Sequence, residues 1–71
     1  MENSLLTPAE IIQVKRLVFT SVDDCRNHLQ TNTYRREILV EALDKSKKFN
    51  EITRARLLQS AINKLDRKAQ P

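Results

Sequence analysis

The chain contains no glycine in 71 residues, and this absence constrains its fold more than any other feature of the sequence. Tight β-hairpin turns depend on Asn-Gly, Asp-Gly or Gly-X pairs, because glycine adopts positive φ angles without steric cost. The two prolines, Pro8 and Pro71, lie near the ends, while helix-forming Leu, Ile, Ala, Glu, Lys, Arg and Gln are plentiful between them. The sequence therefore predicts an all-α protein.

A capping box predicts where the first helix begins. The Thr7 hydroxyl is spaced to accept from the Glu10 amide and the Glu10 carboxylate to accept from the Thr7 amide, while Pro8 fits the first helical position. Ser21 then resembles a second N-cap, which divides residues 8–30 into two helices. A single helix bent near Ser21 fits the same pattern, and the sequence leaves both alternatives open.

Two further helices are predicted in the second half. The polar cluster 31–33 indicates a break and a new cap, followed by a helix that ends near Lys47. Phe49 is expected in the core between elements, and the Asn-Glu pair at 50–51 is expected to open a last helix that runs to about Lys68. Apolar residues recur at three- and four-residue spacings on the inner faces of the predicted helices: Ile11, Val14, Leu17 and Val18; Ile38, Leu39, Ala42 and Leu43; and Ile52, Ala55, Leu58, Ile62, Leu65 and Ala69.

These elements predict a small bundle of three to four short helices, largely antiparallel, around a single core. Residues 1–71 are expected to form one helical domain, because typical domains contain about 100 to 150 residues. Residues 1–6 and 69–71 are expected to be flexible. A core of this size contributes only about 3 to 5 kcal/mol, so a partner or a second copy would add useful stability.

The cysteine content and the first residues favour a cytoplasmic location. Cys25 is the only cysteine and has no partner for an intramolecular disulfide, which fits a reducing compartment. The chain begins Met-Glu-Asn-Ser, with an acid where an export signal carries positive charge, and its apolar runs are short. We expect neither export nor membrane spanning.

Asp24, Cys25 and His28 form the one grouping that resembles a metal or catalytic site. They fall within one helical turn, but a zinc site usually needs four ligands, and the chain has no other cysteine or histidine. A cysteine nucleophile would also need an oxyanion hole and a pocket, which a short, glycine-free chain is poorly suited to build. We predict no enzyme activity and no metal or cofactor, with Cys25 in the core and His28 at or near the surface.

The excess positive charge lies in the second half of the chain. Residues 1–33 hold three basic and four acidic side chains, giving −1, and residues 34–71 hold ten basic and five acidic, giving +5. At about 100° per residue, one face of the predicted last helix is free of acids. Such a face binds phosphate or an acidic protein surface, or is merely solvated, and the sequence leaves these alternatives open. Its members are Arg56, Ser60, Asn63, Lys64 and Arg67.

The last two helices also fit a helix-turn-helix that binds DNA. In that arrangement residues 34–47 would cross the backbone and residues 51–68 would lie in the major groove. Arg54, Arg56 and Ser60 would then reach the base edges. The turn between them lacks the glycine often found there, so an ordinary helical bundle is the alternative.

A second set of side chains is predicted to contact a protein partner. Tyr34 precedes two arginines, and Tyr and Arg are enriched at binding hot spots, although packing at a helix start is the alternative role of Tyr34. Phe19 and Tyr34 are the expected exposed aromatics, fewer than nucleic-acid stacking platforms normally use. The predicted protein-contact residues are Leu5, Leu6, Tyr34, Arg35 and Arg36.

In size, charge and lack of catalytic residues, the chain resembles the small regulators encoded by phages and mobile elements. This class resemblance implies a non-enzymatic regulatory protein that binds nucleic acid or the transcription machinery. One alternative is a protein-binding inhibitor or adaptor without nucleic-acid contact. Another is a helical homodimer that pairs through seam residues such as Leu57 and Ile62.

Overall fold

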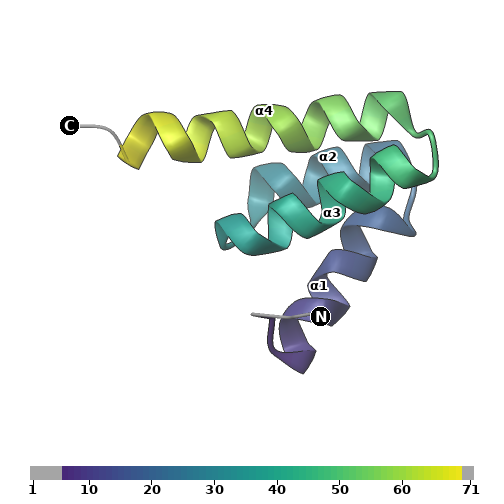
Figure 1. Cartoon of the computed structure of the whole chain (residues 1–71), viewed down its shortest axis with the longest axis horizontal. Coiled ribbons are helices and arrows are strands. Elements are labelled where there is room, and N and C mark those ends of the chain that lie inside the picture. The colour runs from purple at the N-terminus through teal and green to yellow at the C-terminus, as the bar shows by residue number, and fades with distance from the viewer. Residues whose placement is uncertain (1–5, 70–71) are drawn as a thin grey trace.

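The computed structural model describes residues 6–69, which form four α-helices and no strand (Figure 1). The predicted all-α bundle with a single core is therefore confirmed. Of the termini predicted to be flexible, Leu6 packs against the core, and Ala69 is the last residue of the final helix. Residues 1–5 and 70–71 lie outside the described range. The helices are α1 (Pro8–Val18), α2 (Val22–Thr31), α3 (Arg36–Lys48) and α4 (Ile52–Ala69).

Side-chain caps start α1 and α2 where the sequence predicts. The Glu10 amide donates to the Thr7 hydroxyl at 3.2 Å, and the Thr7 amide donates to the Glu10 carboxylate at 3.0 Å. The Asp24 amide donates to the Ser21 hydroxyl at 3.0 Å, which caps α2. Residues 8–30 therefore form two helices, and the alternative of one bent helix is wrong.

The segment between α2 and α3 is longer than predicted. α2 ends at Thr31, as the polar cluster indicates, but α3 begins only at Arg36, and its N-cap residue Arg35 makes no side-chain cap hydrogen bond. The cluster thus ends one helix without capping the next. The intervening extended residues carry Tyr34 into the core.

Asn50 ends α3 and does not open α4, contrary to the prediction. Its φ angle of 59° lies in the left-handed region, which asparagine tolerates better than most residues other than glycine. Its amide donates to the Lys47 carbonyl at 3.1 Å, and the Glu51 amide donates to the Ser46 carbonyl at 2.9 Å. These are the two hydrogen bonds of a Schellman motif, in which a glycine usually takes the left-handed position. Asparagine fills that position in a chain that has no glycine.

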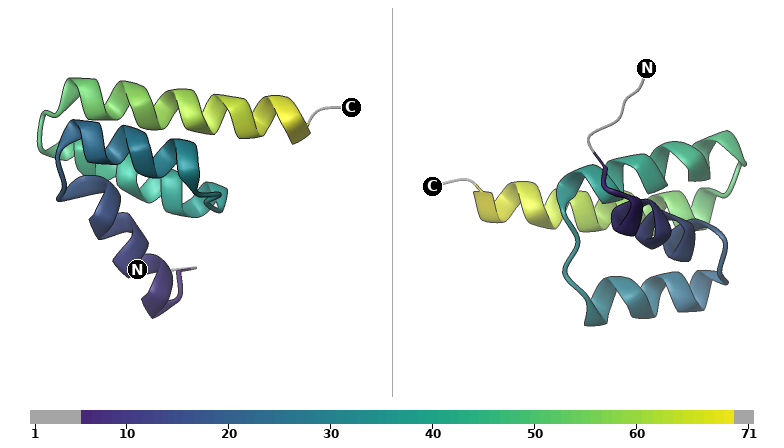
Figure 2. Two further views of the ribbon diagram at one scale, coloured as in Figure 1. Left: turned by 180° about the vertical axis from the view of Figure 1, so that it is seen from behind. Right: turned by 90° about the horizontal axis from the view of Figure 1, so that it is seen from below.

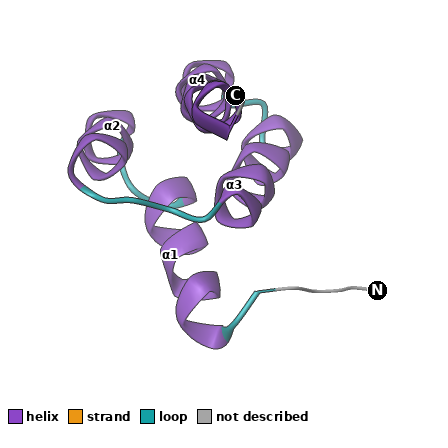
Figure 3. Cartoon of the chain, turned by 90° about the vertical axis from the view of Figure 1, so that its left-hand side faces the viewer, coloured by secondary structure: helices purple, strands orange, loops and turns teal. Residues whose placement is uncertain are grey.

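Helices α1 and α4 lie on opposite sides of the pair formed by α2 and α3, and each of them contacts both (Figures 2 and 3). α2 and α3 are separated in the end-on view of Figure 3. α3 and α4 run antiparallel side by side, and the last turns of α4 extend beyond α3 (Figure 1). The helices of a helix-turn-helix cross at about 90–120°. The predicted helix-turn-helix is therefore wrong, and α3–α4 is an antiparallel helical hairpin.

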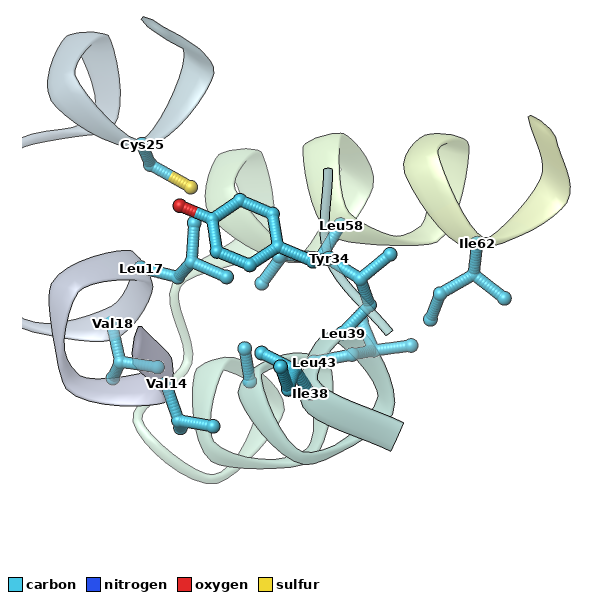
Figure 4. Packing of buried hydrophobic residues seen from close by; sticks show 11 residues of the cluster. Val14, Leu17, Val18, Cys25, Tyr34, Ile38, Leu39, Leu43, Leu58 and Ile62 are labelled. Carbon is cyan, nitrogen blue, oxygen red and sulfur yellow. The ribbon is translucent and has the colours of Figure 1, made fainter. Parts of the chain in front are cut away.

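Tyr34 fills the centre of the core between α2 and α3. Only 8% of its surface is exposed, and its hydroxyl points toward the Cys25 thiol (Figure 4). Burial raises the pKa of both groups, since each charged form would lose its hydration. The buried apolar residues are Val14, Leu17, Val18, Cys25, Tyr34, Ile38, Leu39, Ala42, Leu43, Leu58 and Ile62.

Three apolar residues predicted to face the core are exposed. Ile11, near the start of α1, is 41% exposed although it shares a helical face with the buried Val14 and Val18. Ile52 and Phe49, at 67% and 51%, lie where α3 ends and α4 begins. The predicted inner face of α3 is confirmed in full, since Ile38, Leu39, Ala42 and Leu43 are all buried.

Candidate interaction surface on the last helix

α4 has a polar, positively charged side that faces away from the core. The structure exposes all five side chains that the sequence groups on this face: Arg56, Ser60, Asn63, Lys64 and Arg67. Lys68, one residue further along, is exposed as well. We call Arg56, Lys64, Arg67 and Lys68 the basic strip. At 1.5 Å per residue it extends about 18 Å along the helix.

The basic strip is not neutralised by the rest of the described chain. Asp66 is the only acid in α4, and its carboxylate accepts hydrogen bonds from Arg36 of α3 at 2.9 and 3.4 Å. Within residues 6–69, none of the four cations of the strip forms an ion pair. The positive charge of the strip therefore remains available to an external anion.

The outer face of α3 provides the contrast. Glu41 lies 3.5 Å from Lys45, as their four-residue spacing predicts, and Glu37 lies 3.5 Å from Arg35. These pairs compensate part of the charge of α3 locally. Exposed cations without an ion pair in the described chain also lie at 15–16 in α1 and 47–48 at the end of α3, but α4 carries four of them, and its one acid is paired with Arg36.

A groove of about 430 Å³ runs between α2 and α4 beside the basic strip. Its rim carries Arg26 from α2 and Lys64 and Lys68 from α4, and none of the residues that line it is acidic. The Arg26 guanidinium lies 3.2 Å from Asp23, whose side chain is 91% exposed and turned to solvent. The groove thus combines a cationic rim with an apolar wall, formed by Leu29, Leu39, Leu57, Ala61 and Leu65.

Arg54 is not part of this surface, and its prediction as a base-contacting residue is wrong. Only 4% of it is exposed. Its guanidinium donates to the Leu17 carbonyl at 2.6 Å and to the Thr20 carbonyl, and it lies 3.3 Å from the Glu51 carboxylate. The last carbonyls of a helix have no intrahelical donor, so Arg54 satisfies the end of α1 from inside the bundle. No local sequence signal indicates a contact that spans 37 residues.

The predicted protein-contact residues are mostly engaged within the fold. Tyr34 is buried, so its prediction as a partner contact is wrong and the packing alternative is correct. Arg35 donates to both oxygens of Glu10 at 2.8 and 2.9 Å, while Arg36 binds Asp66. These two arginines hold the α2–α3 connection to the start of α1 and the end of α4.

The remaining predicted contact residues are divided between core, surface and undescribed chain. Leu5 lies outside the described residues, and Leu6 packs partly buried against the core. Ile62, proposed from the sequence as a dimer contact, is only 4% exposed and cannot serve as one. Leu57 is partly exposed in the wall of the groove.

Asp24, Cys25 and His28 do not come together as a site. Cys25 is fully buried, as predicted, whereas Asp24 is exposed and His28 is partly exposed. In residues 6–69, no cluster of three or more histidine, cysteine or acidic side chains has a geometry that would hold a metal ion. Nor is any helix in this range long and apolar enough to cross a membrane.

Sequence reasoning missed one contact between exposed side chains. Phe19 is 66% exposed, as predicted, but its ring lies against Phe49, which the sequence placed in the core. The ring centroids are 6.2 Å apart. The two residues are 30 positions apart, so the contact depends on the two interhelical turns meeting at one end of the bundle.

Comparison with protein family models, curated proteins and solved structures gives no match for this chain. The surface chemistry of the fold is therefore what indicates its function. Two features stand out on that surface: the basic strip with its adjoining groove, and the exposed aromatic pair.

Proposed function

We propose that the chain is a small, non-enzymatic regulatory protein of the cytoplasm that binds nucleic acid through the basic strip of α4. The observation that supports this proposal is the set of four cations with no described acid to neutralise them. Lysine and arginine bind phosphates favourably because binding releases the counterions condensed on the nucleic acid. The strip is about 18 Å long, the length of about five base-pair steps of 3.4 Å.

The expected mode of binding is to the phosphate backbone. Arg54 is buried, and α4 packs against α3 and α2, so the strip presents flexible cations and few groups suited to reading base edges. Phosphate contacts fix the position of a protein but carry no sequence information. Binding should therefore depend strongly on salt and weakly on sequence.

Salt dependence of binding provides the test. We expect Arg56→Ala, Lys64→Ala and Arg67→Ala each to reduce the slope of log affinity against log salt by about 0.9 on duplex DNA and about 0.7 on single strands. Fluorescence anisotropy with labelled duplex and single-stranded oligonucleotides measures both slopes. Lys45→Ala is the matched control, because it removes the same charge from α3, where Glu41 compensates it.

Two outcomes would contradict nucleic-acid binding by the basic strip. A wild-type chain with no affinity for duplex or single strands at low salt would end this proposal. A slope that falls as much in Lys45→Ala as in Arg67→Ala would show that net charge, and not the strip, is responsible. Circular dichroism of each variant confirms that it is folded.

A protein-binding adaptor or inhibitor is the second candidate, and the apolar wall of the groove favours it. Phosphate binding would leave this apolar wall without a contact. An amphipathic helix, in contrast, could place its apolar side against the wall and its acidic flanks against Arg26, Lys64 and Lys68.

Leu57→Gln tests this candidate, because it removes apolar surface from the wall without changing the charge. If this candidate is correct, a pull-down treated with nuclease recovers one stoichiometric partner with the wild type and loses it with Leu57→Gln. Recovery that disappears on nuclease treatment contradicts it.

A further inference from the structure

The end of the bundle where two interhelical turns meet carries three large apolar side chains that are more than half exposed. Phe19 lies in the α1–α2 turn and Phe49 in the α3–α4 turn, and these are the only phenylalanines in the sequence. Ile52 begins α4 just after the second turn. Their exposed fractions are 66%, 51% and 67%. We call these three residues the apolar tip.

Exposure of both phenylalanines is unusual for so small a protein. A chain of 71 residues buries a limited apolar area, and its largest apolar side chains normally contribute most to the core. Here the two rings contact each other with centroids 6.2 Å apart and an interplanar angle of 50°, yet each residue remains more than half exposed. Clustered exposed apolar surface of this kind marks an interaction site more often than an accident of folding.

The apolar tip is held in place by the hydrogen bonds of its two turns. Arg54 binds the Leu17 and Thr20 carbonyls on one side. The Schellman hydrogen bonds of Asn50 and Glu51 fix the other side. Side chains presented from rigid turns lose little conformational entropy when they are covered, which favours association.

We propose that the apolar tip pairs with the tip of a second copy of this chain across a two-fold axis. Charges on either side of the tip support this choice of occupant. The acidic pair 23–24 lies in the first turn of α2, and the basic pair 47–48 lies in the last turn of α3, on two helices that Figure 3 shows apart. A two-fold axis perpendicular to the line between these two sides places the acidic side of each copy opposite the basic side of the other, so the contact is self-complementary. A uniformly charged partner such as nucleic acid would be repelled by one of the two sides.

The dimer does not rest on the proposed nucleic-acid binding. The basic strip starts at Arg56 and runs along α4 away from the tip, so tip-to-tip pairing leaves it uncovered. A dimer would carry two such strips. The two proposals can fail independently. The dimer is tested by its molecular mass, whereas nucleic-acid binding is tested by the dependence of affinity on salt.

Sedimentation velocity over about 1 µM to 1 mM protein tests the pairing. We expect the wild type to shift from the monomer mass of 8.3 kDa toward twice that value as concentration rises. Phe19→Ser combined with Phe49→Ser should raise the dissociation constant at least about 100-fold, because it removes four large apolar side chains from the paired interface. Circular dichroism should show unchanged helix content, since both residues are more than half exposed in the monomer.

The matched control is Ile12→Ser, which removes a 54% exposed apolar side chain from α1 outside the tip. Dimerisation should be unchanged in this variant. A dimer that survives the double substitution, or is lost in Ile12→Ser, would place the interface elsewhere and overturn the proposal. If the double variant fails to fold, Ile52→Ser alone must weaken the dimer, and wild-type affinity in that variant overturns it.

A wild type that remains monomeric up to about 1 mM also overturns the proposal. A dissociation constant above about 1 mM is too weak for a specific dimer. Co-sedimentation of that monomer with anionic vesicles, lost in Phe19→Ser, would then identify a lipid surface as the occupant of the tip. Capture of a different protein by the wild type but not by Phe19→Ser would identify a heterologous partner instead.

Discussion

Among single residues, Arg54 has the most unusual environment, because it is the only buried charged side chain in residues 6–69. Its guanidinium donates to two carbonyls at the end of α1 and in the following turn, while Glu51 balances its charge. Because the last carbonyls of a helix have no intrahelical partner, no amide of α1 donates to these two groups. Arg54 therefore joins α4 to the α1–α2 turn through polar contacts inside a largely apolar core.

Removing those donors should destabilise the fold strongly. Arg54→Met keeps most of the side-chain length but leaves the Leu17 and Thr20 carbonyls unsatisfied and Glu51 unpaired. We expect a loss of about 3 kcal/mol in the free energy of unfolding, measured by urea denaturation. Arg56→Met, an exposed arginine of the same helix, should change stability by no more than about 0.5 kcal/mol. Equal effects of the two substitutions would contradict this role of Arg54.

Glu10 makes stability depend on pH in a defined window. Hydrogen bonds from Arg35 and from the Thr7 amide lower its pKa from 4.5 to about 2. Between these values the folded chain keeps Glu10 ionised while the unfolded chain protonates it. The stabilisation is complete above pH 4.5 and is lost as the pH falls through about 2.

Thermal unfolding at pH 6 and pH 2.5 measures this dependence. We expect Glu10→Gln to be less stable than the wild type at the higher pH and to lose less on acidification, because it cannot titrate. Glu41→Gln is the control, since it removes a carboxylate whose ion pair is with Lys45 of the same helix. If Glu10→Gln and the wild type lose stability in parallel, the Arg35 contact does not set the pH dependence.

Which residue roles are predictable from sequence depends on how far apart the partners lie. The caps at Thr7 and Ser21 involve groups three residues apart, and both were predicted correctly. Asn50 was assigned to the wrong helix, because the same residue type serves at helix starts and in left-handed positions at helix ends. The roles of Tyr34 and Arg54 depend on distant segments, so nothing in their local sequence indicates burial.

At the scale of helices, α2 is attached least firmly. Cys25 is the only residue of α2 that is buried, whereas α3 buries five. Few buried apolar contacts imply a low free energy for local opening. α2 should therefore detach from the bundle before α3 and α4 unfold.

Native-state hydrogen exchange tests this order. We expect the amides of α2 to exchange faster than those of the middle turns of α3 and α4. Ser21→Ala removes the cap of the Asp24 amide, which costs about 1 kcal/mol, and should accelerate exchange in α2 selectively. Thr7→Ala, which removes the corresponding cap of α1, should not affect α2. Equal protection across α2 and α3 would contradict the expected order.

Helical periodicity predicted the faces of α3 and α4 well and failed at helix ends. The inner residues of α3 were all correct, and so were the five polar residues grouped on the outer face of α4, although Arg54 was not. Ile52 was wrong: it lies in the first turn of α4 beside the α3–α4 turn, and 67% of it is exposed. A periodic pattern identifies a face but does not tell how fully each turn of that face is covered.

At the scale of the whole molecule, the pairing of helices decides which charges remain available. Arg36 of α3 binds Asp66 of the adjacent α4, so the only acid of α4 is neutralised by another helix. The basic strip therefore retains its full positive charge, although α4 contains an acid. The sequence predicted the concentration of charge in the second half of the chain, but this pair between helices depends on tertiary structure.

Because Cys25 is buried, the reaction of its thiol can be used to detect opening of the folded chain. The chain has one thiol, it is fully buried, and burial raises its pKa, so the folded protein holds it in an unreactive form. A thiol reagent can modify it only in molecules whose α2 has moved away from Tyr34. The rate of labelling therefore measures how often that helix opens in the native chain, without any engineered probe.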